Sequence, residues 1–226
     1  MKQRTLAATI ETNGIGLHSG VTVNLKLAPA PPNSGYIFVR NDLDDFEIPA
    51  SIEYVSHCNY ATTLMKNGVV LSTTEHLLAA LRGAGLDNVF INVDNIEMPI
   101  MDGSSAVFLD QIEKVGTIEQ NAPRRFLKIC KKVEIEQDNK KMSVEPAQSY
   151  DVECFIDFPH RLIGRQTYDF TLSDGSFGRE ISRARTFGFT KEIEVLRKMN
   201  LALGGSLENA IVLDEDEMLN PMPLRY

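Results

Sequence analysis

The chain has 226 residues, of which 43% are hydrophobic, and carries a formal net charge of -8. This length and apolar content are enough to bury a sizeable core in one or two domains. The acidic balance argues against a nucleic-acid-binding surface, because phosphate binding depends on clustered Lys and Arg side chains. We therefore expect a globular protein without a nucleic-acid partner.

Cysteine usage and hydropathy predict a cytoplasmic protein. The three cysteines are an odd count without Cys-x-x-Cys spacing, so neither a disulfide framework nor a cysteine zinc site is indicated. The first residues lack the apolar run of a signal peptide, and no stretch of about 20 apolar residues is available to span a membrane. We expect no transmembrane segment.

The first half of the chain is predicted to contain a β-hairpin, two helices and a further strand. Apolar alternation over 21–27, a proline-rich turn and an apolar run at 36–39 predict the hairpin. Residues 73–82 have apolar positions at helical spacing and are followed by glycine stop signals. Residues 88–93 alternate as a strand, and residues 105–115 predict the second helix.

The second half repeats this plan. The sequence predicts strands near 133–135, 142–144, 152–158 and 168–172, and helices near 178–185 and 191–199. We infer a duplicated α+β unit with a boundary near residues 121–124. The predicted domains are therefore residues 1–122 and residues 123–226.

Residues 72–81 (Ser-Thr-Thr-Glu-His-Leu-Leu-Ala-Ala-Leu) set a carboxylate beside an imidazole where a turn enters an apolar helix. A neutral imidazole can hold zinc while a neighbouring carboxylate takes a proton from water, which is hydrolase chemistry. The alternative is structural: Ser72 as N-cap and Glu75 three residues later form a capping box, with His76 in the first turn.

Three further stretches identify a family. They are residues 14–20 (Gly-Ile-Gly-Leu-His-Ser-Gly), residues 99–104 (Pro-Ile-Met-Asp-Gly-Ser), and residues 181–189 (Ile-Ser-Arg-Ala-Arg-Thr-Phe-Gly-Phe) followed by Leu-Gly-Gly-Ser at 203–206. Together, and in this order along the whole chain, they resemble the UDP-3-O-acyl-N-acetylglucosamine deacetylases. These are zinc amidases of lipid A synthesis in Gram-negative bacteria.

The resemblance implies an α+β fold of two similar domains with the active site between them. It also implies that the family sequence continues beyond this chain with a His-x-x-x-Asp pair that supplies two more zinc ligands, so the second domain is expected to be incomplete. The implied reaction is removal of the N-acetyl group from a UDP-linked acylated glucosamine, the committed step of lipid A biosynthesis.

The resemblance also assigns roles to residues of this chain. His76 matches a zinc ligand, Glu75 the general base, and Thr186 the hydroxyl that stabilises the oxyanion. The residues matching the substrate site, including the passage for the acyl chain, are Leu17, Phe187, Phe189, Ile193, Leu196, Ala202 and Ser206.

Several alternatives remain open from the residues themselves. Thr186 also fits an ordinary hydroxyl at a helix end, and the apolar residues after it also fit core packing. His18 lies in a glycine-rich turn that suits either ligand approach or a plain turn, and Asp102 is interpreted as a turn and helix-cap carboxylate. For the whole chain, the second hypothesis is an incomplete or inactive relative that keeps the fold and part of the substrate groove.

Overall fold

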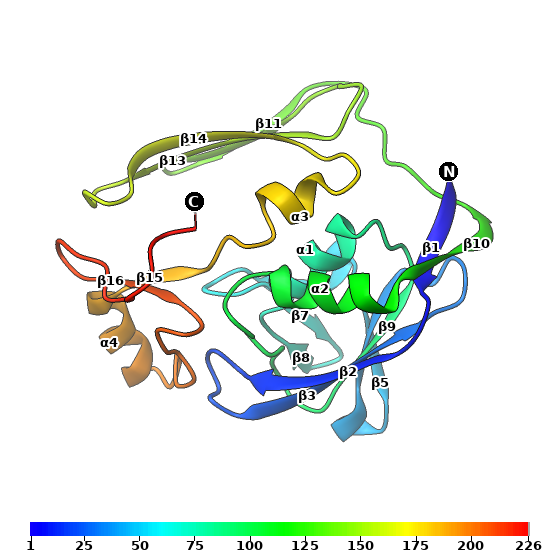
Figure 1. Cartoon of the computed structure of the whole chain (residues 1–226), viewed down its shortest axis with the longest axis horizontal. Coiled ribbons are helices and arrows are strands. Elements are labelled where there is room, and N and C mark those ends of the chain that lie inside the picture. The colour runs from blue at the N-terminus through cyan, green and yellow to red at the C-terminus, as the bar shows by residue number, and fades with distance from the viewer. Residues whose placement is uncertain (226) are drawn as a thin grey trace.

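The first half of the chain is built on a five-stranded sheet, seen in a computed structural model that describes residues 1–225. Its strands are β2 Ile10–Ile15, β3 Thr22–Pro29, β4 Tyr36–Arg40, β5 Phe46–Pro49 and β9 Val89–Val93. The strand order is β2-β3-β9-β4-β5 (Figure 1). All neighbours are antiparallel except β4 and β9, which run parallel.

The position of β9 corrects one prediction. The hairpin expected between residues 21–27 and 36–39 is wrong, because β9 lies between β3 and β4 and pairs with both. Val89, Ile91 and Val93 are all 0% exposed, so this strand places its apolar side chains in the deepest part of the core. Local alternation correctly predicted the strand over 88–93, but it carries no information on which neighbours a strand pairs with.

Two helices and the apolar face of this sheet form the core. They are α1 Glu75–Gly83 and α2 Ala106–Val115. The buried residues of α1 are Leu77, Ala80 and Leu81, and those of α2 are Phe108, Leu109 and Ile112. These side chains join the alternating inward residues of β3 in one hydrophobic cluster. The helices predicted over 73–82 and 105–115 are therefore confirmed, with starts shifted to Glu75 and Ala106.

The first half also contains shorter strands and 3-10 helices. They are β1 Lys2–Leu6, η1 Asn41–Leu43, η2 Ile52–Tyr54, β6 Val55–His57, β7 Thr63–Lys66, β8 Val69–Leu71 and β10 Thr117–Pro123. Strands β6, β7 and β8 form one antiparallel sheet, and β1 pairs with β10.

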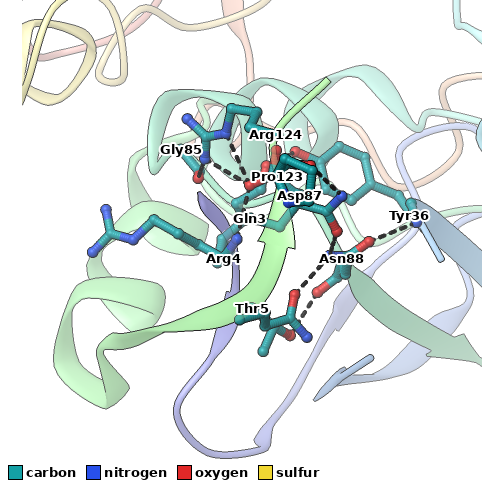
Figure 2. Close-up of polar contacts among 12 residues, drawn as sticks. Gln3, Arg4, Thr5, Tyr36, Gly85, Asp87, Asn88, Pro123 and Arg124 are labelled. Atoms are coloured by element: carbon teal, nitrogen blue, oxygen red, sulfur yellow. Dashed lines mark hydrogen bonds and ion pairs between the residues drawn. The ribbon is translucent and has the colours of Figure 1, made fainter. Parts of the chain in front are cut away.

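A polar network holds the β1–β10 ribbon against the core (Figure 2). The Asn88 side chain donates to the side-chain oxygens of Gln3, at 2.8 Å, and Gln120, at 2.7 Å. Arg124, which follows β10, forms a 2.6 Å ion pair with Asp87. The segment that joins the two halves is therefore anchored on the first half by paired, partly buried groups.

The second half, up to residue 225, consists of short two-stranded sheets and two helices. Its elements are β11 Val133–Gln137, β12 Lys140–Val144, β13 Asp151–Phe158, β14 Gly164–Thr171, α3 Ser176–Glu180, β15 Phe187–Phe189, α4 Thr190–Lys198 and β16 Ile211–Leu213. Strands β11/β12 and β13/β14 form two hairpins that extend above α3 (Figure 1). Strand β15, helix α4 and strand β16 form a parallel β-α-β unit.

These elements confirm the four predicted strands and the helix near 191–199, whereas the helix expected over 178–185 is shorter and earlier, at α3. The mixed α+β class is confirmed; the duplication and the boundary between residues 122 and 123 stay predictions. Within residues 1–225 no helix combines the length and apolar content needed to cross a membrane. The three cysteines are free and exposed.

The two hairpins expose many apolar side chains. Examples are Ile135 (67% exposed), Met142 (69%) and Phe155 (55%). In contrast, Phe170 of β14 and Phe177 of α3 belong to the hydrophobic cluster of the first half. The second half is thus joined to the core mainly below the hairpins, where α3 meets α1.

The contact between α1 and α3 depends on Gly83. A Cβ atom at this position would collide with the ring of Phe177, so the two helices approach closely only because residue 83 lacks a side chain. Phe177 is buried, and this contact ties the second half to the last turn of α1.

We expect Gly83→Ala to lower the free energy of unfolding by about 1–3 kcal/mol, because the added methyl overpacks the Phe177 contact and outweighs the gain in helix propensity. Gly188→Ala is the matched control, since a Cβ there would meet nothing closer than 3.9 Å. Urea unfolding followed by circular dichroism measures both. Equal stability of the two variants would contradict the assigned role of Gly83.

Candidate active site at the start of helix α1

The Glu75–His76 pair occupies the first turn of α1, and the turn before it is strained. Thr73 has a left-handed backbone with φ of 60°, which is unusual for a β-branched residue. Thr74 takes the N-cap position, and its hydroxyl donates to the carbonyl of Thr62 at 3.1 Å rather than capping the helix. The first turn of α1 is therefore positioned by the neighbouring 62–63 segment.

The predicted capping box is wrong. The Ser72 hydroxyl lies 3.0 Å from the hydroxyl of Thr63, and the Glu75 carboxylate accepts the backbone N–H of Thr62 at 2.9 Å through Oε2. The left-handed Thr73 moves the N-cap from residue 72 to residue 74, so Ser72 is too far back to cap the helix. One Glu75 oxygen is oriented by a backbone donor, and Oε1 has no hydrogen bond to residues 1–225.

The His76 imidazole is half-buried, and its environment favours the neutral form. Burial lowers the pKa of His76, and the opposing attraction of the Glu75 and Asp102 carboxylates raises it by less than burial lowers it. A neutral imidazole is the form that binds a metal ion. The electrostatics at this position therefore suit the ligand role that the family resemblance implies.

The turn at residues 101–104 lies beside His76. The Asp102 carboxylate accepts from the backbone N–H of Ser104 at 3.0 Å and from its hydroxyl at 2.7 Å, and it pairs with Arg225 at 2.9 Å. Burial raises the pKa of Asp102, but these donors outweigh it and hold the pKa below its ordinary value. The interpretation of Asp102 as a turn carboxylate is confirmed, whereas its helix-cap part is wrong, because Ser105, whose side chain makes no capping hydrogen bond, is the N-cap of α2. The charge of Asp102 also acts on His76.

Thr186 is held against the same turn. Its backbone N–H donates to Gly103 at 2.8 Å, and its carbonyl accepts from Ile211 at 2.9 Å. The preceding Arg185 donates through Nε to the carbonyl of Asp102 at 2.8 Å. The Thr186 hydroxyl makes no hydrogen bond within the described part of the chain, so it remains a potential donor to a ligand.

The residues expected to line the acyl passage fall into two groups. Phe187 and Phe189 pack edge to face, with ring centroids 5.8 Å apart, and Phe158 joins them. Ile193 and Leu196 are half-buried on α4, which has no fully buried residue. This arrangement leaves a small apolar surface over the β15-α4-β16 unit instead of a closed core.

The second group surrounds the glycine-rich turn. Leu17 accepts through its carbonyl from the N–H of Gly204 at 3.0 Å, and the backbone N–H of Ala202 points at Nδ1 of His18 at 3.4 Å. Ser206, in contrast, is exposed and forms a turn with Asn209. The structure thus brings the 202–205 loop against the first half, with Ser206 at its outer end.

Strained backbone gathers around these residues. Tyr60, Thr73, Met101 and Ala202 all have positive φ. Each lies next to the site: Thr73 precedes Glu75 by two positions, Met101 precedes Asp102, and the other two contact the His18 ring. Such conformations cost about 1–3 kcal/mol each and concentrate at functional sites. Sequence reasoning missed all four, because no local motif indicates a left-handed tyrosine, threonine, methionine or alanine.

The donors within residues 1–225 provide only part of a metal site. No group of three or more His, Cys, Asp or Glu side chains in this range is arranged to hold a metal ion. A catalytic zinc takes three protein ligands. His76, with the Glu75 carboxylate adjacent, fits one of these positions by its chemistry.

Comparisons with known proteins show the family of the chain. The family model described as LpxC: UDP-3-O-acyl N-acetylglycosamine deacetylase matches residues 3–226. The UDP-3-O-acyl-N-acetylglucosamine deacetylase of Myxococcus xanthus (strain DK1622) is 50% identical over 225 residues, which cover 99% of this chain and 72% of the relative. Proteins of the same name from Coxiella burnetii (strain RSA 493 / Nine Mile phase I) and Chromohalobacter salexigens are 47% and 46% identical, each match covering 100% of this chain and 76% of the relative.

The family model and these relatives define the class as a deacetylase, which is a hydrolase. The chain belongs to the UDP-3-O-acyl-N-acetylglucosamine deacetylase family. The family predicted from residues 14–20, 99–104, 181–189 and 203–206 is therefore confirmed.

We expect the His76 imidazole of the metal-free protein to titrate below the ordinary value of about 6.5, because burial disfavours its charged form. Glu75→Gln removes an attraction that raises the pKa, so it should lower the midpoint further. Since the unfolded chain then binds a proton that the folded chain rejects, the free energy of unfolding should fall as the pH drops below about 6.5. NMR titration of the imidazole checks the midpoint, and a value at or above 6.5 would contradict the effect of burial.

Proposed function

We propose that this protein removes the N-acetyl group of UDP-3-O-acyl-N-acetylglucosamine in lipid A biosynthesis, with zinc as its cofactor. The observation that carries the proposal is the Glu75–His76 pair, oriented by backbone contacts at the strained start of α1. Three relatives named for this reaction, at 46–50% identity, support the substrate. The free cysteines suit a reducing compartment and support a cytoplasmic location.

Each residue has a step that its surroundings support. Glu75 takes the proton from the attacking water: its Oε2 is held by the N–H of Thr62, and Oε1 is left to accept. The Thr186 hydroxyl donates to the oxyanion that develops on the acetamide carbonyl, because its backbone is held on both sides and its hydroxyl has no partner in the described residues. The neutral imidazole of His76 would hold the metal. Zinc, when bound, supplies a Lewis acid that lowers the pKa of water.

The acyl chain of the substrate needs an apolar surface near the reacting amide. The edge-to-face rings of Phe187 and Phe189 and the half-buried side chains of Ile193 and Leu196 offer one. Leu17, in the glycine-rich turn, and Ala202, in the loop bonded to that turn, belong to the same proposed site. These residues are the substrate-binding part of the proposal.

An inactive relative is the alternative. The presence of Glu75, His76 and Thr186, together with identity of 50% to the Myxococcus xanthus protein, favours the active enzyme. The incomplete donor set within residues 1–225 makes metal content the measurement that separates the two.

Glu75→Gln should lower turnover by about 10² to 10⁴ and leave zinc content unchanged, because it removes a general base without removing a ligand. The assay counts bound zinc and released acetate in a hybrid that adds the part of the Myxococcus xanthus relative outside the match. Glu53→Gln, on an exposed 3-10 turn, is the control. Loss of zinc in the Glu75 variant would show a structural or ligand role, and unchanged turnover would remove Glu75 from the mechanism.

Phe189→Ala should weaken binding of an acyl-UDP-glucosamine about tenfold or more, because an apolar side chain of this size contributes roughly 1.5–3 kcal/mol when buried. Calorimetric titration of the chain itself measures this without turnover. Phe126→Ala, which removes an exposed ring outside the proposed passage, should have no effect. Equal affinities for the two variants would reject the passage.

A further inference from the structure

Glu97 is a deeply buried carboxylate that neither the motifs nor the proposed chemistry uses. It is 2% exposed, and its partners within residues 1–225 are three neutral donors. Oε1 accepts from the backbone N–H of His18 at 2.8 Å and from the hydroxyl of Thr73 at 3.0 Å, and Oε2 accepts from the backbone N–H of Ser19 at 2.8 Å. Burying a carboxylate costs several kcal/mol, and these charge-assisted bonds offset that cost.

The backbone around Glu97 joins the same two regions. The carbonyl of Ile96 accepts from Ser72 at 2.9 Å, and the N–H of Met98 donates back to Ser72 at 3.0 Å. On the other side, Ile100 donates to Ile15 at 2.9 Å. The 96–100 segment therefore lies between the approach to α1 and the glycine-rich turn, with the Glu97 side chain bonded to both.

The bond to Thr73 acts on the strained residue of the site. A left-handed β-branched residue persists only where its surroundings hold it, and the hydroxyl of Thr73 is held by Glu97. Thr74, Glu75 and His76 follow directly, so the conformation of Thr73 sets the direction in which α1 begins. Glu97 is thus bonded to the start of α1 through Thr73, and it makes no hydrogen bond to Glu75 or His76 within residues 1–225.

The bonds to His18 and Ser19 act on the second half of the chain. The carbonyl of His18 accepts from Leu203 at 3.1 Å, and the His18 ring receives Ala202 at Nδ1 and lies 3.4 Å from the carbonyl of Tyr60 at Nε2. This pair of contacts fits the Nε2-protonated tautomer. The turn also has no space for a side chain at residue 16, because a Cβ atom on Gly16 would lie 2.5 Å from Oε2 of Glu97.

We propose that Glu97 is a positioning residue that locks the start of α1, with Glu75 and His76, to the 16–20 turn and through it to the 202–204 loop of the acyl passage. One carboxylate sets the spacing between the reacting groups and the surface that holds the acyl chain. The inference relies on the proposed function for the roles of Glu75 and His76. The test measures the surroundings of the His18 and His76 rings and not turnover. A failure of the proposed role of Glu97 can therefore be distinguished from a failure of the proposed function.

The test uses Glu97→Gln and Thr73→Val in the 226-residue protein. The amide keeps the size of Glu97 but turns an NH₂ group toward one of its donors, and valine keeps the shape of Thr73 without its hydroxyl. Asp87→Asn is the matched control: it makes the same carboxylate-to-amide change at a partly buried group that pairs with Arg124, away from the site (Figure 2).

Imidazole ¹H–¹³C NMR spectra at constant pH, with zinc absent, give the readout. Both site variants should shift the His18 and His76 resonances and leave His160, which is bonded to the carbonyl of Asp214, in place. In Glu97→Gln, amide exchange at His18 or Ser19 should accelerate about tenfold, as expected for one lost hydrogen bond. Asp87→Asn should change none of these signals.

Unchanged His18 and His76 signals in Glu97→Gln, or equal shifts in Asp87→Asn, would overturn the proposal. If Glu97→Gln does not fold, Thr73→Val decides alone: a shifted His76 supports the coupling, and an unmoved His76 rejects it. The NMR test does not measure turnover, so the link from Glu97 to α1 can hold even if the protein proves not to be a deacetylase. Conversely, if the separate assay detects acetate release but the resonances do not move, only the role of Glu97 is rejected.

Discussion

The packing of α1 is the constraint on which the rest of the molecule depends. Leu77, Ala80 and Leu81 are buried against the sheet and α2, and this fixes the rotation of the helix about its axis. Glu75 and His76 must then emerge at the partly exposed first turn. The hydrophobic core therefore does more than stabilise the fold, since it determines which way the two reactive side chains point.

Both ends of this helix are connected to the second half, one directly and one through other residues. At the C-terminal end, the absence of a side chain at Gly83 lets Phe177 of α3 join the core. At the N-terminal end, Thr73 is connected through Glu97 to the glycine-rich turn, and this turn bonds to Leu203. The second half is therefore connected to α1 at two places, directly through Phe177 and indirectly through Glu97 and the glycine-rich turn.

The sequence predicted those features that depend on local periodicity. The apolar spacing in residues 77–81 indicated α1, and the alternation over 88–93 indicated β9. The neighbours of β9 were not predictable, because parallel pairing with β4 is a long-range choice that alternation does not encode. The capping box failed for a related reason: a left-handed Thr73, held by residue 97, moved the N-cap by two positions.

The residues of the candidate site also differ in whether local sequence or long-range contacts reveal them. Glu75, His76 and Thr186 were proposed from the sequence because they match family motifs, whereas Glu97 has no motif and is recognisable only by three donors that come from two distant segments. A buried charge bonded by neutral donors orders the backbone that supplies them. The strain at Thr73 and the desolvation of Glu97 are individually unfavourable, yet each is compensated by a contact with the other. This mutual dependence explains why two residues that contribute no chemistry lie between the reactive pair and the loop at residues 202–204.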